Sequence, residues 1–269
     1  MATDTLPTEI HPTAIVSEDA ELGAGVIVRA YAIIGPGVRV GDRTVIDHHA
    51  DVRGPLEIGP DCVIGFSTAI GHDPQIRGGD GQYGATKIGA RNVFREFSQV
   101  HRSRYPDKTT VIQDDGYFMA NAHVGHDSQV EDNVTLVNGA ALGGHVHVEC
   151  NAFLGGGAMV HQFCRVGTYS MLGGHAGPSQ DVPPYCRIGG ARNPHLEGLN
   201  AIGIRRAGFS PETRQALKDA YKALFRQEGN LDVRIASIPL DVPEVAHLVK
   251  FVQTTERGVI GISGTKAED

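Results

Sequence analysis

Aliphatic side chains recur at every sixth position along most of this chain. The first run covers eleven consecutive positions, from Ile10 to Ile70, and a second run extends from Ile112 to Leu172. Between these runs the same step appears at Ile88, Phe94 and Val100. A period of six fits neither the 3.6-residue period of an amphipathic helix nor the simple alternation of an open sheet. Short repeats of fixed length are typical of parallel β-helices, so the pattern predicts a mainly β solenoid.

Small side chains form a second series, four residues after most of the aliphatic positions, as at Ala14, Ala140 and Ala158. Large and small inward side chains in alternation suit a narrow three-sided prism, in which each hexad makes one side. Three hexads, or 18 residues, then complete one coil. Cys62 and Cys164 fall in the small inward position, which indicates that both fill the core.

Two stretches interrupt the repeat, and a third region lacks it. Residues 72–86 and 102–110 are polar, contain glycine or proline and are out of phase, so we expect loops ejected from the solenoid. Ser210-Pro211 is a typical helix start, and a further helix is expected near Asp241. We therefore divide the chain into a β-helix domain, 1–190, and a small helical domain, 191–269, which covers an open end or flank of the solenoid.

Composition excludes several classes of protein. The net charge of −7 argues against a nucleic-acid binder, which needs a basic surface. No apolar stretch is long enough to span a membrane, and the first residues do not resemble a signal peptide. The four cysteines lack the spacing of a metal site and are too few for a disulfide scaffold. We expect a cytoplasmic protein without a transmembrane segment.

The 18-residue coil predicts which outward residues stack on one another. Adding 18 to His126 gives Gly144, and adding 18 again gives Gln162; the same step takes Asp127 to His145. Successive coils lie ~4.8 Å apart. A neutral imidazole can remove a proton from a hydroxyl near pH 7, and a carboxylate beside it can orient the ring. A glycine one coil away offers a backbone N–H to a developing oxyanion. This column favours direct acyl transfer to a substrate hydroxyl, without a covalent acyl-enzyme.

Histidines are concentrated near this column, since His101, His123 and His161 also fall there. One alternative is a zinc lyase of the carbonic anhydrase type, with His123 and His126 as ligands and a third histidine from a neighbouring subunit. Another is a non-catalytic scaffold trimer, in which these histidines are polar side chains at the surface with no chemical role. Arg205-Arg206 is either a solvated charge pair or a place for phosphate.

Several motifs resemble the UDP-N-acetylglucosamine acyltransferase family, and together they cover most of the chain. They are HPTAIV (11–16), NAHVGHD (121–127), GGHV (143–146), VHQFCRVG (160–167), QDVPPY (180–185) and NAIGIRRAGF (200–209). The resemblance implies a left-handed coil, which chain physics alone does not favour. It also implies a homotrimer that moves an (R)-3-hydroxyacyl chain from acyl carrier protein to the 3-hydroxyl of UDP-N-acetylglucosamine, the first step of lipid A biosynthesis. We expect neither a cofactor nor a metal ion.

The resemblance also implies roles for individual residues. The catalytic group would be His126 as general base, Asp127 as its orienting partner and Gly144 as the oxyanion donor. The substrate-binding residues would be His101, His123, His145, His161, Gln162, Gln75, Asn200 and Arg206. Gly173 and Gly174 would leave room for the acyl chain. The site would lie between neighbouring subunits.

Two departures from the family pattern concern substrate contacts. No acidic residue follows Gln75, where the family has one, and Asp73 or Asp80 could supply it instead. Ile202 and Ala207 stand where members can carry Glu and a further Arg. A related transferase that acts on another nucleotide amino sugar, or an acetyl-CoA-dependent enzyme, is therefore an alternative.

Overall fold

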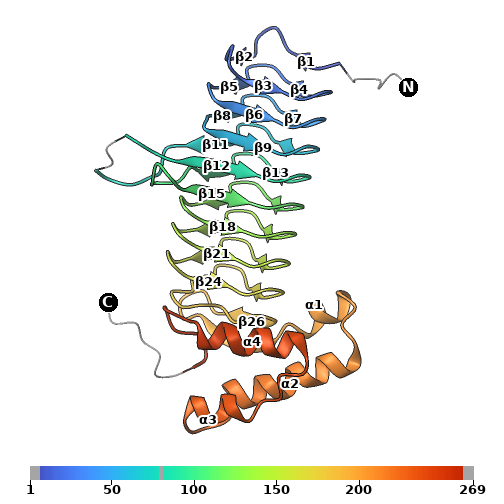
Figure 1. The fold of residues 1–269 in the computed structure, drawn as a ribbon, viewed down its shortest axis with the longest axis vertical. Helices are drawn as coiled ribbons and strands as arrows, with labels where there is room; N and C mark the ends of the chain where they lie inside the picture. Colours follow the sequence, from blue (N-terminus) through green and yellow to red (C-terminus); the bar gives the residue numbers. More distant parts are fainter. Residues whose placement is uncertain (1–6, 79–80, 263–269) are drawn as a thin grey trace.

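The computed structural model describes residues 7–78 and 81–262, and these form a left-handed parallel β-helix followed by four short helices (Figure 1). The strands form three sheets. The first contains β1 (Glu9–Ile10), β4 (Ile27–Val28), β7 (Val45–Ile46), β10 (Val63–Ile64), β13 (Val93–Phe94), β16 (Tyr117–Phe118), β19 (Thr135–Leu136), β22 (Phe153–Leu154), β25 (Met171–Leu172), β26 (Cys186–Gly189) and β27 (His195–Leu199).

The second sheet contains β2 (Ile15–Val16), β5 (Ile33–Ile34), β8 (Asp51–Val52), β11 (Ala69–His72), β14 (Gln99–His101), β17 (His123–Val124), β20 (Ala141–Leu142) and β23 (Met159–Val160). The third contains β3 (Glu21–Leu22), β6 (Val38–Val40), β9 (Leu56–Ile58), β12 (Ala85–Ile88), β15 (Thr109–Ile112), β18 (Gln129–Val130), β21 (His147–Val148) and β24 (Arg165–Val166). The chain visits the sheets in turn, one strand in each per coil.

The strand register confirms the 18-residue coil. Val124 pairs with Leu142, and Leu142 pairs with Val160. The aliphatic residue of each hexad points inward, as Leu142 does at 1% exposure, and the small residues are buried between them. Cys62 and Cys164 lie in this core with no exposed surface, and burial raises the pKa of each thiol to about 11. The repeat therefore encodes both the prism and its contents.

Both ejected loops leave the β-helix at the edge between the second and third sheets. The first connects β11 to β12 and the second connects β14 to β15, so the irregular residues that the structure describes are 73–78 and 81–84 in the first loop and 102–108 in the second. Both loops are shorter than the expected 72–86 and 102–110 because polar residues can still occupy inward positions. Thr86 pairs with Thr110 in the third sheet, and both are buried.

Four helices cover the C-terminal end of the β-helix (Figure 1): α1 (Ala201–Arg206), α2 (Pro211–Phe225), α3 (Leu231–Ala236) and α4 (Pro243–Gln253). The Ser210 hydroxyl accepts the Thr213 N–H at 3.1 Å, which makes Ser210 the N-cap of α2, as the sequence predicts. The helices share a second hydrophobic core that includes Leu217 and Leu248. No helix in the described ranges is long and apolar enough to cross a bilayer.

The junction between the two parts is continuous. The antiparallel strand β27 extends the first sheet beyond residue 190, so the division at that residue stays a prediction. Arg165 from β24 donates to Asp181 at 2.9 Å and lies 4.1 Å from the Phe251 ring centroid of α4. Asp181 is 1% exposed, so this ion pair fixes the last coil against the helices.

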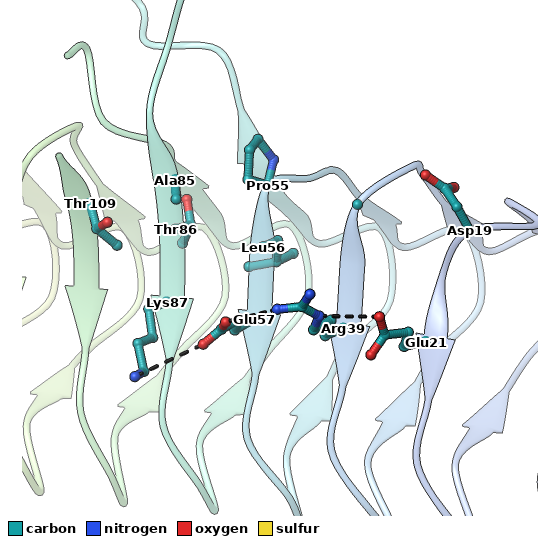
Figure 2. Close-up of a pocket in the computed structure, with 11 residues that line it drawn as sticks. Asp19, Glu21, Arg39, Pro55, Leu56, Glu57, Ala85, Thr86, Lys87 and Thr109 are labelled. Atoms are coloured by element: carbon teal, nitrogen blue, oxygen red, sulfur yellow. Dashed lines mark hydrogen bonds and ion pairs between the residues drawn. The ribbon is translucent and has the colours of Figure 1, made fainter. Parts of the chain in front are cut away.

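Outward positions of the third sheet carry paired charges in the N-terminal coils (Figure 2). Arg39 lies 3.3 Å from Glu21 and 3.4 Å from Glu57, and Lys87 lies 3.9 Å from Glu57. A cavity of about 420 Å³ lies over this row. The charges are already paired with one another and more than half exposed, so each pair contributes little stability and none calls for a ligand.

Candidate active site

The predicted column of His126, Gly144 and Gln162 is present at the edge between the second and third sheets. The His145 N–H donates to the His126 carbonyl at 2.9 Å, and the Phe163 N–H donates to the Gly144 carbonyl at 3.1 Å. These bonds join the corners of three successive coils. The column therefore follows directly from the 18-residue repeat.

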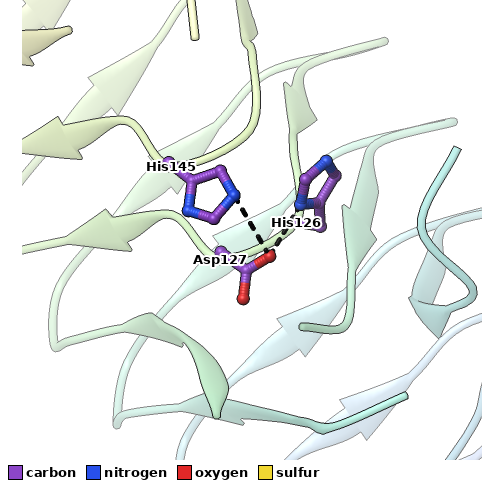
Figure 3. Close-up of side chains that lie close together, drawn as sticks. All are labelled: His126, Asp127 and His145. Atoms are coloured by element: carbon purple, nitrogen blue, oxygen red, sulfur yellow. Dashed lines mark hydrogen bonds and ion pairs between the residues drawn. The ribbon is translucent and has the colours of Figure 1, made fainter. Parts of the chain in front are cut away.

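His126 and Asp127 form a hydrogen-bonded pair at this edge (Figure 3). The His126 Nδ1 donates to Asp127 Oδ2 at 2.7 Å. Their side chains are 15% and 4% exposed. Because a carboxylate only accepts hydrogen bonds, the proton sits on Nδ1, and the lone pair of Nε2 has no donor among the residues that the structure describes. This is the arrangement of a general base with an orienting carboxylate.

The second ejected loop surrounds Asp127 with hydrogen-bond donors. The Ser103 hydroxyl donates to Asp127 Oδ1, and the Arg104 N–H donates to Oδ2 at 3.1 Å. The Asp127 N–H donates to Thr110 Oγ1 at 2.7 Å. Burial raises the pKa of Asp127, but the hydrogen bonds from Ser103, His126 and Arg104 outweigh it, so this pKa lies below its ordinary value. The carboxylate is therefore ionised beside His126.

Gly144 lies in contact with the His126 ring. A Cβ at Gly144 would lie 2.6 Å from Cε1 and 2.7 Å from Nε2 of His126, closer than two such atoms can approach. Within the described residues, the Gly144 N–H has no hydrogen-bond acceptor. Glycine here thus allows the ring to approach the backbone and leaves one N–H beside the ring free to donate.

His145 packs on the other side of Asp127. Its ring stacks on Phe163 at 4.6 Å between centroids and meets the His126 ring edge-on at 5.3 Å. Its Nε2 lies 3.7 Å from Asp127 Oδ2. Burial lowers the pKa of His145 despite the nearby carboxylate. A neutral His145 has no charge to attract the carboxylate, so His126 is the stronger partner of Asp127.

His123 lies on β17, in the same coil as His126, and His101 lies on β14, one coil earlier, with their ring centroids 5.1 Å apart. The His101 Nδ1 is 2.7 Å from the Asp73 carbonyl, and the His123 Nδ1 is 3.2 Å from the Leu142 carbonyl. Burial lowers the pKa of both imidazoles. The two Nε2 atoms are buried and have no hydrogen-bond partner among the residues that the structure describes. Buried polar atoms are rarely left unpaired, so both are available to a ligand.

Other predicted residues lie further from His126. Gln162 and His161 are exposed at the same edge, where the His161 Nδ1 lies 3.5 Å from a guanidinium nitrogen of Arg257. Gln75 is exposed in the first ejected loop. The structure thus brings His101, His123 and His145 close to the His126–Asp127 pair. Gln75, His161 and Gln162 are exposed around it.

Asn200 and Arg206 lie on a different edge of the prism. Both line a cavity of about 720 Å³ between α1, the first sheet and the edge between the third and first sheets. The Asn200 side chain accepts the Gly203 N–H at 3.0 Å and donates to the Tyr169 carbonyl at 2.9 Å, so it caps α1. Ile202, one of the departures, lines the same cavity.

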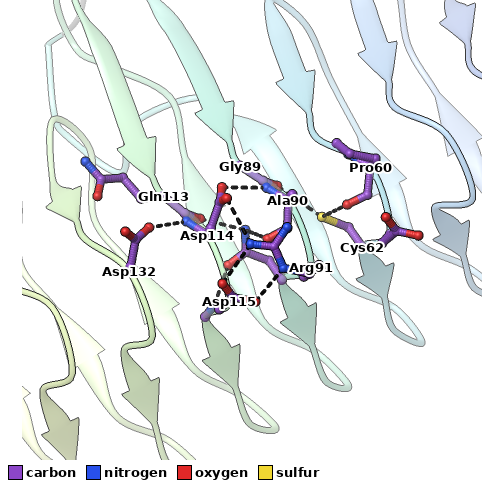
Figure 4. Close-up of polar contacts among 12 residues, drawn as sticks. Pro60, Cys62, Gly89, Ala90, Arg91, Gln113, Asp114, Asp115 and Asp132 are labelled. Atoms are coloured by element: carbon purple, nitrogen blue, oxygen red, sulfur yellow. Dashed lines mark hydrogen bonds and ion pairs between the residues drawn. The ribbon is translucent and has the colours of Figure 1, made fainter.

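Satisfied charges occupy the preceding coils of this same edge (Figure 4). Arg91 donates to Asp115 at 2.7 Å and to Asp114 at 3.0 Å, and Asp114 accepts the Ala90 N–H at 2.8 Å. Cys62 contacts the Gly89 carbonyl there, which agrees with its place in the core. These coils therefore hold the edge together, whereas the cavity around Asn200 is open to a ligand.

Gly173 and Gly174 follow β25 and lie on the third edge, between the first and second sheets. A Cβ at Gly174 would have its nearest neighbour at 3.5 Å, which is ordinary contact. Within one chain, the predicted site residues are thus distributed over three edges, and the His126–Asp127 pair lies on one of them.

His126, Asp127 and His145 also form the one metal-ligand group found among the described residues. Two donor atoms on a tetrahedral zinc ion lie about 3.4 Å apart. The 2.7 Å distance between His126 Nδ1 and Asp127 Oδ2 is shorter and fits a hydrogen bond. Asp127 is also engaged by Ser103 and Arg104, so the group fits proton transfer better than zinc coordination.

Sequence reasoning missed Ser103, Arg104 and Phe163. The stretch 102–110 is recognisable as a loop near the site, but its contacts depend on how it folds back. Phe163 could have been found, because it lies 18 residues after His145 and so stacks on it.

Comparison with known proteins gives consistent matches. The family model described as "Udp N-acetylglucosamine O-acyltransferase; Domain 2" matches residues 181–260. A Syntrophobacter fumaroxidans protein named acyl-[acyl-carrier-protein]--UDP-N-acetylglucosamine O-acyltransferase is 43% identical over 256 residues, covering 94% of this chain and 99% of the relative. A Thermodesulfovibrio yellowstonii protein of the same name is 42% identical, covering 93% of this chain and 98% of its own.

Solved structures agree with these relatives. The UDP-N-acetylglucosamine acyltransferase of Francisella novicida superposes with a TM-score of 0.90 at 29% identity, covering 95% of each chain. The Campylobacter jejuni enzyme of that name superposes with a TM-score of 0.88 at 31% identity, covering 94% of this chain and all of the other, 100%. The likeness includes the β-helix and the C-terminal helices together.

Proposed function

We propose acyl transfer to a nucleotide sugar as the reaction of this chain, which belongs to the UDP-N-acetylglucosamine O-acyltransferase family. The donor is acyl carrier protein bearing an (R)-3-hydroxyacyl chain, and the acceptor is the 3-hydroxyl of UDP-N-acetylglucosamine. This reaction is the first step of lipid A biosynthesis. The observation that carries the proposal is the His126–Asp127 pair packed against the N–H of Gly144.

The chemistry uses these three groups in order. His126 Nε2 takes the proton of the sugar hydroxyl while its oxygen attacks the thioester carbonyl. The Asp127 carboxylate stabilises the resulting imidazolium, and the Gly144 N–H donates to the oxyanion of the tetrahedral intermediate. The intermediate then breaks its C–S bond, and the imidazolium returns the proton to the departing thiolate of the carrier. The acyl chain moves directly, with neither a cofactor nor an acyl-enzyme.

Substrate contacts follow from the remaining residues of this edge. The Nδ1 atoms of His101 and His123 donate to backbone carbonyls, so their unpaired Nε2 atoms can accept hydrogen bonds from sugar hydroxyl groups. His145 and Gln162 lie along the column and would contact the sugar and the acyl group, with His161 beside them and Gln75 supplied by the first ejected loop. Each of these assignments is a proposal.

A homotrimer would complete the site. Asn200 and Arg206 line a cavity on one edge, Gly173 and Gly174 lie on another, and His126 lies on the third. One chain cannot bring three edges of a prism to one substrate, but neighbouring chains can. We propose that the nucleotide or the carrier's pantetheine arm contacts Asn200 and Arg206 of one subunit while His126 of the next reacts.

The departures from the family pattern, after Gln75 and at Ile202 and Ala207, concern substrate contacts. The chemistry of the His126 column does not depend on them. A related acceptor, another nucleotide amino sugar, is therefore the second candidate, and its support is Ile202 in the cavity around Asn200. A cytoplasmic location is part of the proposal because acyl carrier protein is the donor.

The test is incubation of the purified protein with a panel of (R)-3-hydroxyacyl carrier proteins and either UDP-N-acetylglucosamine or a UDP-linked diamino sugar. The product mass gives the acceptor, the chain length and the reaction together. Acylated UDP-N-acetylglucosamine is the expected product, and its loss in His126→Ala excludes a scaffold role. Transfer to the diamino sugar alone would overturn the assigned acceptor. Absence of transfer to either would overturn the function.

A further inference from the structure

The loop after β14 places a buried hydroxyl against the catalytic carboxylate. Ser103 has no exposed surface, and its Oγ donates to Asp127 Oδ1. On the basis of the proposed function, we infer that Ser103 is a positioning residue that holds Asp127 so that Oδ2 meets His126. The acid–base unit then has three members, Ser103, Asp127 and His126, linked by hydrogen bonds across two coils.

The two carboxylate oxygens have different partners. Oδ1 accepts from Ser103, whereas Oδ2 accepts from the His126 Nδ1 at 2.7 Å and from the Arg104 N–H at 3.1 Å. A carboxylate with donors on both oxygens cannot rotate about its Cβ–Cγ bond without breaking one of them. The Ser103 bond therefore fixes the plane in which Oδ2 faces His126.

The Ser103 hydroxyl is held within reach of two acceptors. The Tyr105 N–H donates to Ser103 Oγ at 3.0 Å, and the hydroxyl proton faces Asp127 Oδ1 and, at 3.1 Å, the Tyr105 carbonyl. The contact with Asp127 is the shorter one and its acceptor is charged, so the hydroxyl donates to the carboxylate. The backbone of Ser103 is bound on both sides, because its N–H donates to Ala85 at 3.2 Å and its carbonyl accepts from Gly84 at 2.9 Å. Ser103 is therefore held by the end of the first ejected loop, so both loops contribute to its position.

Space at Gly84 shows how closely the loops pack. A Cβ at Gly84 would lie 2.2 Å from the Tyr105 carbonyl oxygen and 3.0 Å from the Ser103 Cβ. Only glycine fits there without moving the backbone that carries Ser103. The position of the hydroxyl is thus set by packing as well as by hydrogen bonds.

Ser103 does not have the geometry of a nucleophile. In a Ser-His-Asp triad the hydroxyl lies against the imidazole nitrogen opposite the carboxylate. Here the hydroxyl contacts the carboxylate itself and is fully buried. Its contribution is to the charge and orientation of Asp127, which in turn orients His126. Loss of one donor also raises the pKa of Asp127 toward its ordinary value, because burial then has less opposition.

The test compares Ser103→Ala with Ser98→Ala in the full-length protein. Ser98 is a matched control: it is equally buried, and its hydroxyl donates to the Arg95 carbonyl, with no contact to Asp127. We expect kcat to fall about 10- to 100-fold in Ser103→Ala, with KM for both substrates nearly unchanged, because a small misplacement of the base slows the chemical step. Ser98→Ala should retain kcat within about twofold, because its hydroxyl bonds only to backbone carbonyls and does not position the base.

A double-mutant cycle separates positioning from simple loss of stability. If Ser103 acts through Asp127, Ser103→Ala costs nothing further in an Asp127→Asn background. Equal losses in both backgrounds, an effect on KM alone, or a kcat equal to that of Ser98→Ala would each overturn the inference while leaving the proposed function intact.

A measurement without substrate keeps the two proposals distinguishable. The ¹⁵N chemical shifts of the His126 ring report whether Nδ1 carries the proton, and the signal can be assigned by its loss in His126→Ala. We expect the wild-type ring and the Ser98→Ala ring to be protonated at Nδ1, and the Ser103→Ala ring to shift toward a mixture of tautomers. Identical spectra for the wild type and Ser103→Ala would contradict the inference, even if neither acyl acceptor proved to be the substrate.

Discussion

The ring of His126 occupies the space where a side chain at Gly144 would begin, since a Cβ there would lie 2.7 Å from Nε2. The nitrogen proposed to accept the substrate proton is thus next to the N–H proposed to stabilise the oxyanion. This close approach joins the two halves of the chemistry, and it makes the identity of residue 144 critical.

Replacement of Gly144 by Ala should displace the His126 ring and lower kcat by about 10²-fold, within the range seen when an oxyanion donor or base is misplaced. The matched control is Gly156→Ala. Gly156 holds the equivalent corner position on another edge, and a Cβ there meets its nearest neighbour at 3.6 Å. Steady-state kinetics of both variants, with circular dichroism to verify the fold, measure the difference. Full activity in Gly144→Ala would show that the ring position is not critical.

Replacement of Asp127 by Asn should lower kcat by about 10⁴-fold without loss of folding, because an amide in place of a carboxylate no longer fixes the Nδ1 tautomer or stabilises the imidazolium. Asp107→Asn is the control, since Asp107 is an exposed acid in the second ejected loop, near Asp127 but without a bond to His126. Single-turnover measurements with acyl carrier protein isolate the chemical step. A loss confined to KM would instead assign Asp127 to substrate binding.

A pH-dependent contact joins α4 to the third sheet. His247 Nε2 lies 2.8 Å from Glu149 Oε2, and this hydrogen bond raises the pKa of His247 above 6.5. Burial raises the pKa of Glu149, but the bonds from His247 and Thr168 bring it below 4.5. The raised value of His247 means that its contribution to stability is complete below pH 6.5 and is lost as the pH rises through the folded value. The lowered value of Glu149 means that its contribution is lost as the pH falls below 4.5.

His247→Gln should therefore lower the free energy of unfolding most between about pH 4.5 and 6.5, by up to ~1 kcal/mol for a partly exposed pair, and less at pH 9. Denaturant unfolding at several pH values measures this difference. His11→Gln should show no such dependence, because the exposed ring of His11 is bonded to Thr13 alone among the described residues. A constant difference at every pH would show that His247 acts through packing.

Mixed trimers test whether the site is shared between subunits. His126→Ala and Arg206→Ala should each be nearly inactive as homotrimers. Co-refolding equal amounts of the two should restore activity to a minor but clear fraction, because some interfaces then combine an intact His126 with an intact Arg206. The control mixes His126→Ala with Asp127→Asn, which affect the same edge and cannot complement. Sedimentation or light scattering verifies the trimer, and a monomeric active enzyme would contradict the shared site.

Metal removal should leave the enzyme active. The 2.7 Å contact between His126 and Asp127 fits a hydrogen bond, so dialysis against a chelator is expected to change kcat by less than about twofold. Metal content is measured in parallel on the same samples. Stoichiometric zinc that is lost together with activity would favour the zinc lyase alternative.

Much of the site could be predicted because the fold is periodic. The step of 18 residues is enough to put Gly144 after His126 and His145 after Asp127, and the register has this spacing. The N-cap at Ser210 was also predictable, since capping depends on neighbours in sequence. The loop boundaries were harder to predict, because Thr86 and Thr110 look like loop residues in the sequence but fill inward positions of the coil.

The amino-acid sequence by itself determined the prism, its coil length and the stacked column of His126, because each of these follows from a repeat that is the same in every coil. The tertiary structure decided how the ejected loops fold back, and with it the contact of Ser103 with Asp127, which are 24 residues apart, with Ser103 in a loop outside the repeat. It also separated Asn200 and Arg206 from His126 on different edges of the prism. The physical reason is that a loop's path is set by packing and hydrogen bonds to distant coils, and no local pattern encodes them.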